Sequence, residues 1–292
     1  MTPTLIHHDI NRLSRTRDWA EIQERMLLPL YEAVYERTGV GPGTRLLELN
    51  CGSGLALLRA AARGASVTGT EPDPERLRLA GERLLPDPVW GWGTRRWPAR
   101  LLSSLPASAR EAGQSIRAPF TLITSFGSPP AMDQLRRAVA LAEPGAGVVL
   151  SGRGRPEECA VSAALRVGDR LGRTVRDPAD GGVGGEAAET PDAPGAAGLR
   201  EIALAAGIRP VEEGEVGCPF GYPGMTSALR GLLATGSFDE AVRGVGVDLV
   251  AKELAEALNP YLGSDGSVWL SNILRYVVCR VPGEADAGAV RV

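Results

Sequence analysis

The chain has 292 residues, of which 43% are hydrophobic and 23% charged, and its formal net charge is −3. This composition is typical of a globular protein with a sizeable core, and the near-neutral charge argues against a nucleic-acid-binding protein, whose domains are usually strongly basic. No apolar run approaches the roughly 20 residues that a membrane helix needs, and the N-terminus lacks the apolar core of a signal peptide. We therefore expect a cytoplasmic protein without a nucleic-acid or membrane partner.

The cysteines and histidines are few and poorly placed for metal binding. The four cysteines lie far apart without a CxxC pair, which favours neither a zinc site nor a disulfide framework. His7 and His8 are adjacent, and no third ligand is visible beside them. We therefore expect no metal site and a reducing compartment.

The first half of the chain alternates helical stretches with short apolar runs. Apolar residues at helical spacing over 18–38, interrupted by Pro29, predict two short helices. Strands are then expected at 45–50, 65–70, 88–92, 119–125 and 146–151. Helices are expected between them at 54–63, 74–85 and 131–143. This alternation is typical of a parallel sheet with helices on both faces.

The second half contains a long stretch with little capacity to form a core. Residues 174–198 are rich in Gly, Ala, Pro and Asp and predict a mobile loop. The other expected elements are helices at 160–172, 199–206, 224–235 and 238–259, a strand at 208–216 and a final strand within 267–281. The seven strands together predict an α/β fold with a doubly wound, mostly parallel sheet.

The turn after the first expected strand carries the main functional signal. In "ELNCGSG", Gly52 and Gly54 lack Cβ atoms, so the backbone can approach a ligand closely, and the next helix offers free N–H groups. About twenty residues later the second strand ends at Glu71, the position of an acid that hydrogen-bonds ribose hydroxyls. Leu57 stands where a dinucleotide fingerprint has its third glycine. The pattern therefore favours a nucleoside site of another kind.

These strings resemble those of class I S-adenosylmethionine-dependent methyltransferases. "GPGTRLLELNCGSG", "VTGTEPDPERLRLAGERL" and "FTLITSFGS" stand in the family's order. "WAEIQE", "RPEEC", "GEVGCPFGYP" and "ILRYVV" are similar to a bacterial branch related to the ubiquinone and menaquinone-biosynthesis methyltransferases. The resemblance implies S-adenosylmethionine as the cofactor and a Rossmann-like domain at 41–292, with a helical cap at 1–40 and a cap insertion near 153–198.

The resemblance also implies a set of cofactor contacts. Glu48 orders the loop and faces the amino-acid end of the cofactor, and Glu71 holds the ribose. The remaining positions let the methionine pass, flank the adenosine or line the pocket: Cys51, Gly52, Gly54, Pro72, Asp73, Ser125 and Phe126. A solvated acid at the end of a strand is the structural alternative for Glu71.

Two cofactor-binding positions depart from the family's pattern. Asn50 stands where motif I has a glycine; asparagine tolerates left-handed backbone better than other residues, but its side chain narrows the site. In "VWGWGTRRWP", which resembles "VxxGDxxxLP", Thr94 falls on the position of the adenine-contacting Asp. Its hydroxyl is a weaker acceptor than a carboxylate, so we expect weakened cofactor binding rather than its loss.

Residues 90–117 are rich in Trp and Arg, with Glu111 as the single acid. One interpretation is an amphipathic helix whose tryptophans pack on the core. The other places this segment beside the cofactor, where Arg over Trp would suit a planar aromatic or acidic substrate. The sequence leaves both open.

The acceptor side offers few candidates for acid–base chemistry. Methyl transfer is an in-line displacement, so the protein mainly positions the reactants and needs a base only if the acceptor must lose a proton. The candidates by location are Glu21, Glu24, Tyr31 and Tyr222, although such residues are more often found at a surface or in packing.

Three functions are consistent with these observations. The leading hypothesis is methyl transfer to an O, N or C nucleophile of a small-molecule substrate, in secondary metabolism. Asn50 and Thr94 leave open a methyltransferase-fold protein that catalyses a cyclisation or rearrangement, or a non-catalytic binding protein. A homodimer is an open alternative to a monomer.

Overall fold

The structure, a computed structural model, describes residues 12–85, 98–105, 119–127, 129–173 and 196–283. The chain divides into two compact units. The helical unit comprises Met1–Met26, Arg155–Asp192 and Cys218–Ile273, and the sheet unit comprises Leu27–Gly154, Ala193–Gly217 and Leu274–Val292. Each unit is thus assembled from three separate stretches of sequence, and the expected domain division after residue 40 remains a prediction.

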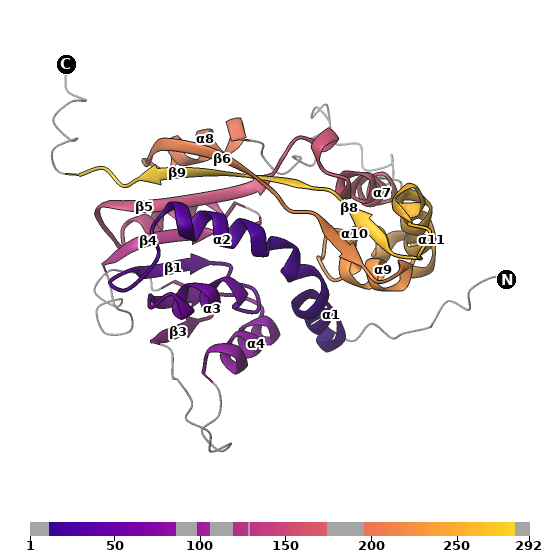
Figure 1. Cartoon of the computed structure of the whole chain (residues 1–292), viewed down its shortest axis with the longest axis horizontal. Coiled ribbons are helices and arrows are strands. Elements are labelled where there is room, and N and C mark those ends of the chain that lie inside the picture. Colours follow the sequence, from indigo (N-terminus) through magenta and orange to yellow (C-terminus); the bar gives the residue numbers. More distant parts are fainter. Residues whose placement is uncertain (1–11, 86–97, 106–118, 128, 174–195, 284–292) are drawn as a thin grey trace, which may run out of the picture. The chain divides into compact units, whose positions relative to one another are not determined.

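The sheet unit contains a seven-stranded sheet in the order β3-β2-β1-β4-β5-β9-β6 (Figure 1). Its strands are β1 Arg45–Leu49, β2 Ser66–Thr70, β3 Ala99–Leu102, β4 Phe120–Ser125, β5 Ala142–Arg153, β6 Arg209–Gly217 and β9 Ile273–Arg280. The first five strands pair in parallel, and β9 runs antiparallel to β5. The predicted α/β class, with a mostly parallel seven-stranded sheet, is confirmed.

Helices cover both faces of this sheet, which explains why its central strands are continuous apolar runs. The helices are α2 Leu28–Arg37, α3 Leu55–Ala62, α4 Pro74–Leu84, α6 Met132–Val139 and α8 Ala196–Ala205. On one face, Ile123 of β4 packs in a cluster with Leu135 of α6 and Leu199 of α8. On the other, Leu57 of α3 lies so close to Gly69 of β2 that a Cβ there would be 2.4 Å from it.

The third strand is the main difference from the expected elements of this unit. β3 begins at Ala99 and pairs with β2 at the sheet edge, whereas the expected strand at 88–92 lies outside the described residues. Pro29 lies in the first turn of α2 and does not interrupt a helix. The first turn leaves its N–H groups unbonded within the helix, so a proline is tolerated there.

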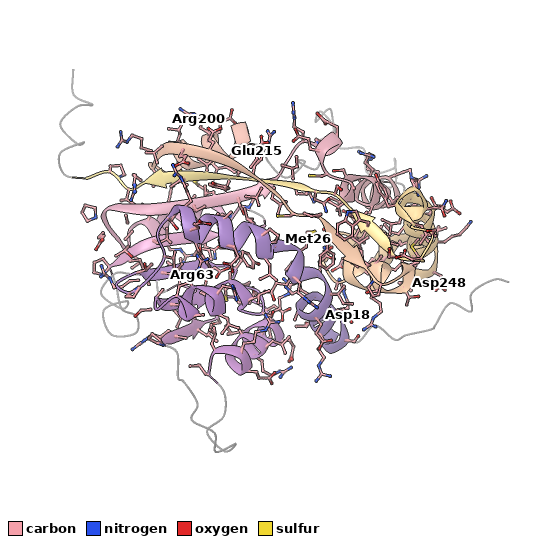
Figure 2. All side chains as sticks on the ribbon, viewed as in Figure 1. Asp18, Met26, Arg63, Arg200, Glu215 and Asp248 are labelled. Atoms are coloured by element: carbon pink, nitrogen blue, oxygen red, sulfur yellow. The ribbon has the colours of Figure 1, made fainter. Side chains whose placement is uncertain are left out.

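The helical unit is built mainly from short helices. They are α1 Arg12–Asp18, a π-helical turn Trp19–Gln23, α7 Val161–Arg173, α9 Met225–Leu233, α10 Asp239–Val245 and α11 Val247–Leu258. 3-10 turns lie at Glu24–Leu27, Pro156–Glu158 and Asn259–Tyr261, and β7 Phe220–Tyr222 pairs antiparallel with β8 Val268–Leu270. Asp18 of α1, labelled in Figure 2, accepts hydrogen bonds from Arg230 of α9.

Two expected elements of this region are each divided in the structure. The predicted helix at 238–259 is α10 and α11, because Gly246 between them has a φ of +84° that helical backbone does not allow. The predicted final strand is β8 and β9, which belong to different sheets. Between them, Asn272 forms an isolated antiparallel bridge with Cys159 and belongs to neither strand. Its side-chain amide accepts a hydrogen bond from the N–H of Val161 and donates one to the carbonyl of Leu270.

The predicted mobile loop at 174–198 lies outside the described residues as far as 195, and its last three residues begin α8. His7 and His8 also lie outside them. In the part of the chain that the structure describes, no helix has both the length and the apolar character that crossing a bilayer requires.

Candidate functional site

The strand order of the sheet reverses between β1 and β4, because β2 and β3 lie on one side of β1 and β5 lies on the far side of β4. Open α/β sheets bind ligands at such a switch point, in the crevice outside the carboxyl ends of the strands. The segments that leave these ends begin at Asn50, Glu71, Ser103 and Phe126. They form the candidate site, and all belong to the sheet unit.

The loop after β1 has three residues with left-handed backbone. Asn50, Gly52 and Gly54 have φ of +56°, +58° and +78°, and Asn50 is the one non-glycine residue with positive φ in the described ranges. A Cβ on Gly54 would lie 2.9 Å from the Cβ of Ala80 in α4. Gly54 is therefore required both by its backbone and by packing, whereas Asn50 is a non-glycine residue that adopts glycine-like backbone.

Glu71 joins the second strand to this loop. Its side chain is 4% exposed; Oε2 accepts a hydrogen bond from the Gly52 N–H at 2.9 Å and Oε1 accepts one from the Asp73 N–H at 3.0 Å. Burial raises the pKa of Glu71 above its ordinary value, although both N–H donors oppose this shift. Each carboxylate oxygen keeps a second lone pair for a further donor. The structure thus brings the glycine turn and the strand-end acid into direct contact.

The two residues after Glu71 have different surroundings. Pro72 is exposed. Asp73 is the N-cap of α4, and its Oδ1 accepts hydrogen bonds from the N–H groups of Glu75 and Arg76 at 2.8 and 3.1 Å. An N-cap aspartate contributes roughly 0.5–2 kcal/mol to stability. Asp73 therefore has a structural role that the sequence did not assign to it.

Three more predicted positions are buried near the carboxyl ends of β1 and β4. Glu48, Cys51 and Ser125 are at most 3% exposed. The Ser151 hydroxyl of β5 donates to the carbonyl of Ser125 at 3.3 Å and accepts from the Gly127 N–H at 3.1 Å. Ser151, which carries no sequence signal, therefore fixes the turn that leaves β4.

An aromatic cluster lies beside that turn. The rings of Tyr31 and Phe126 have centroids 4.7 Å apart, and Tyr35 meets Phe126 edge-on at 5.9 Å. The Tyr35 hydroxyl donates to the carbonyl of Ala56 at 3.1 Å, and Arg63, labelled in Figure 2, lies over its ring. Burial raises the pKa of Tyr35 well above its ordinary value, so this phenol stays protonated. The structure thus joins Tyr31, an expected catalytic residue, to Phe126, an expected cofactor residue.

The other three catalytic candidates belong to the helical unit. Glu21 is exposed, whereas Glu24 is 2% exposed. Tyr222 is 1% exposed and its hydroxyl bonds Oε1 of Gln23 at 2.8 Å. Burial raises the pKa of Tyr222, so its phenol is a poor base and its surroundings fit a packing role.

Thr94 and most of the Trp- and Arg-rich segment lie outside the described residues. The carboxyl end of β3 is instead marked by the carbonyl of Leu102, which accepts a hydrogen bond from the Glu71 N–H at 3.0 Å. Ser103 and Ser104 follow it and are exposed. These serines were not among the expected site residues, although a short apolar run followed by a polar pair signals the end of a strand.

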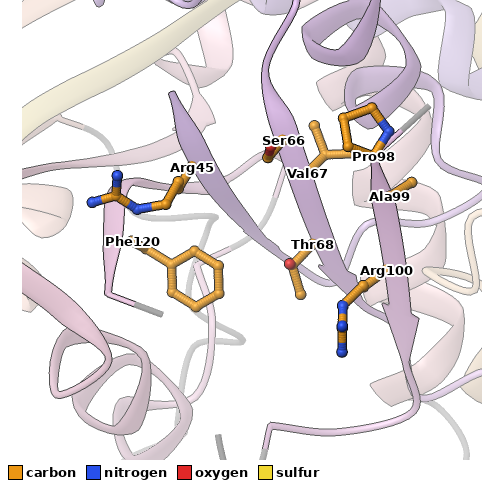
Figure 3. A pocket seen from close by; sticks show the side chains of 8 residues that line it. All are labelled: Arg45, Ser66, Val67, Thr68, Pro98, Ala99, Arg100 and Phe120. Carbon is orange, nitrogen blue, oxygen red and sulfur yellow. The ribbon is translucent and has the colours of Figure 1, made fainter. Parts of the chain in front are cut away.

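A cavity of about 160 Å³ lies elsewhere in the sheet unit (Figure 3). It is lined by Arg45, Ser66, Val67, Thr68, Pro98, Ala99, Arg100 and Phe120. Most of these residues stand at the amino ends of β1 to β4, opposite the candidate site. Arg45 is held there by Glu143 at 2.6 Å and by the carbonyl of Pro119 at 2.5 Å, so the cavity is not the predicted cofactor site.

No protein-family model matches the chain. An uncharacterized protein of Mycobacterium tuberculosis is 38% identical over 66 residues, and one of Mycobacterium bovis is 39% identical over 66 residues. Each alignment covers 23% of this chain and 24% of the relative, so the chain spans about a quarter of the length of the curated relatives that it matches.

Solved structures match over most of the chain. A candidate type II methyltransferase from Anaeromyxobacter dehalogenans has a TM-score of 0.52 at 17% identity, covering 86% of this chain and 97% of that one. The Escherichia coli protein YjhP has a TM-score of 0.51 at 14% identity, covering 91% and 98%. At such low identity these likenesses concern the fold alone, which is a Rossmann-like α/β fold.

Proposed function

We propose that this protein is an S-adenosylmethionine-dependent methyltransferase that acts on an O, N or C nucleophile of a small molecule, in secondary metabolism. The observation that carries the proposal is the hydrogen bond between the Glu71 carboxylate and the Gly52 N–H at the switch point. It combines an acid at the end of β2 with a left-handed glycine turn after β1, which is the arrangement that a nucleoside requires.

The residues of this edge fit the proposed cofactor. Glu71 keeps lone pairs for two ribose hydroxyls, and the left-handed turn at Gly52 lets the backbone approach the ligand. Pro72 and the exposed Ser103 and Ser104 would flank the adenosine, because Leu102 is bonded to the backbone of Glu71. The other positions expected to line the site are Glu48, Asn50, Cys51, Gly54, Ser125 and Phe126, with Thr94 as the alternative to the serines.

When bound, the cofactor supplies an electrophilic methyl group on a sulfonium. The protein's contribution is to orient the acceptor in line with that group and to exclude water. The paired rings of Tyr31 and Phe126 suit this task, because an aromatic wall is apolar and its face attracts a cation. Of the four acid–base candidates, Tyr31 is the one that belongs to the same unit as Glu71.

Titration with S-adenosylmethionine, followed by mass analysis of candidate acceptors, tests the proposal. Cofactor binding with a gain of one methyl group in the product supports it. A product of unchanged mass would favour a cyclisation or rearrangement, and absence of binding would leave a non-catalytic role. Tyr31→Phe distinguishes proton transfer by the Tyr31 hydroxyl from packing by its ring. Loss of turnover with unchanged cofactor affinity indicates proton transfer.

A further inference from the structure

Two amide side chains meet across the switch point. Asn50 follows β1, and Gln134 lies in the first turn of α6, the helix after β4. Nε2 of Gln134 donates a hydrogen bond to Oδ1 of Asn50 at 3.2 Å. Among the described residues, each of these amides has the other as its hydrogen-bond partner. Because the strand order reverses between β1 and β4, this bond joins the segments that leave these two strands, where a ligand is expected.

The side chain at position 50 is not required by the fold. The φ of +56° at Asn50 is one that glycine adopts without cost, and any side chain there adds strain. Strained residues tend to cluster at functional sites, where the side chain has a task that offsets the strain. Asn50 is exposed, so its amide is accessible to a ligand and is not part of the core.

The amide pair has hydrogen-bonding capacity left after this mutual bond. Asn50 keeps the two N–H donors of Nδ2, and Gln134 keeps the acceptor Oε1. N–H donors suit a carboxylate, and a carbonyl oxygen suits an ammonium group. An amino acid carries both groups on one carbon, so the pair offers complementary partners to a zwitterion.

The sheet order places this pair on the side of Glu71 that lies opposite to β3. Glu71 follows β2, which has β3 on one side and β1 and β4 on the other. This step rests on the proposed function: a cofactor anchored through its ribose at Glu71 has adenine at one end and its amino-acid group at the other. With the adenine towards Ser103, which follows β3, the amino-acid group extends towards Asn50 and Gln134.

We propose that Asn50 and Gln134 form a two-amide clamp for the amino-acid end of the cofactor. Nδ2 of Asn50 donates to the α-carboxylate, and Oε1 of Gln134 accepts from the α-ammonium group. The clamp makes this end of the site specific for a ligand that carries an intact amino acid.

Two nucleosides that differ in this group test the clamp. S-adenosylhomocysteine carries the amino acid, and 5′-methylthioadenosine keeps the adenosine and the thioether without it. Asn50→Gly and Gln134→Ala are each expected to weaken S-adenosylhomocysteine binding about tenfold, the loss of one hydrogen bond to a charged group. Binding of 5′-methylthioadenosine should stay within about twofold, since it has no group for the clamp. Calorimetry gives both dissociation constants.

Glycine is the appropriate replacement at position 50, because it keeps the left-handed backbone. Arg136→Ala is the control on α6, since the Arg136 side chain bonds the carbonyl of Ala205 and has no part in the amide pair. Equal losses for both ligands, or unchanged affinity for S-adenosylhomocysteine, would overturn the clamp while leaving the proposed function intact. If the unaltered protein binds neither nucleoside, the proposed function fails, and the clamp fails with it.

Discussion

The two ends of the strands in the seven-stranded sheet are built differently. We call the side where β1 to β4 begin the amino edge and the side where they end the carboxyl edge. The amino edge contains a cavity of about 160 Å³ with two arginines in its lining, Arg45 and Arg100. The carboxyl edge contains a turn of left-handed residues joined to the buried carboxylate of Glu71. The cavity lies at the first edge, whereas the buried acid and the left-handed turn lie at the second.

This difference shows that a cavity alone does not indicate a binding site, because the polar groups that line it can already be bonded within the fold. At the amino edge Arg45 is already bonded to Glu143 and to a backbone carbonyl, so its polar groups serve the fold. At the carboxyl edge strained backbone, a buried acid and an amide pair converge where helices on opposite faces leave the sheet. Strained backbone and buried acids cluster at functional sites, which is why we propose that a ligand binds at this edge.

The largest expected effect comes from adding one methyl group at the carboxyl edge, compared with adding one at the amino edge. Gly54→Ala at the carboxyl edge combines left-handed strain with a clash against Ala80 and should cost about 2–5 kcal/mol of unfolding free energy. Gly43→Ala, in the turn before β1, has a φ of +91° but nothing within 4 Å of the new Cβ, so strain alone should cost about 1–2 kcal/mol. Urea unfolding measures both; equal losses would show that α4 does not pack closely on the turn.

Ligand binding should depend on one edge only. Glu71→Ala is expected to weaken S-adenosylhomocysteine binding by about 1–3 kcal/mol, because ribose hydroxyls lose their acceptor. Arg100→Ala in the cavity lining is the matched control and should leave the dissociation constant within about twofold. The reverse pattern, with Arg100 required and Glu71 dispensable, would move the site to the amino edge.

The raised pKa of Glu71 makes binding sensitive to pH. The ionised carboxylate accepts hydrogen bonds from ligand hydroxyls. The affinity for S-adenosylhomocysteine should therefore be highest above the raised pKa of Glu71 and fall as the pH drops through it. The fall should begin above pH 4.5, the ordinary value for a glutamate, and approach about tenfold per pH unit, the effect of one proton. Calorimetry of S-adenosylhomocysteine between neutral and mildly acid pH checks this, and Glu71→Gln, which cannot ionise, should give a flat profile.

The smallest expected effect concerns the backbone at position 50. Asn50→Ala should lower the free energy of unfolding by up to about 1 kcal/mol, because alanine tolerates a φ of +56° less well than asparagine. Asn50→Gly should not lower it, since glycine adopts this backbone freely. Thermal unfolding of both variants tests these expectations. If Asn50→Ala is as stable as the unaltered protein, the turn relaxes to another conformation.

The sequence by itself determined the fold class and the two ends of the candidate site. Apolar runs and glycine turns are local signals, so β1, β2 and β4 and the helices after them lie close to their expected positions. The same holds for the left-handed turn and Glu71, because residues that follow consecutive parallel strands must emerge at one edge.

Only the tertiary structure decided the rest, because it depends on contacts between residues distant in sequence. The third strand is Ala99–Leu102 because that segment pairs with β2, although an earlier run looked equally strand-like. Asp73 caps a helix, Ser151 holds the turn after β4, and Gln134 reaches Asn50 from 84 positions along the chain. No pattern in the local sequence specifies such partners, since each one is selected by the packing of elements that meet only in the folded sheet.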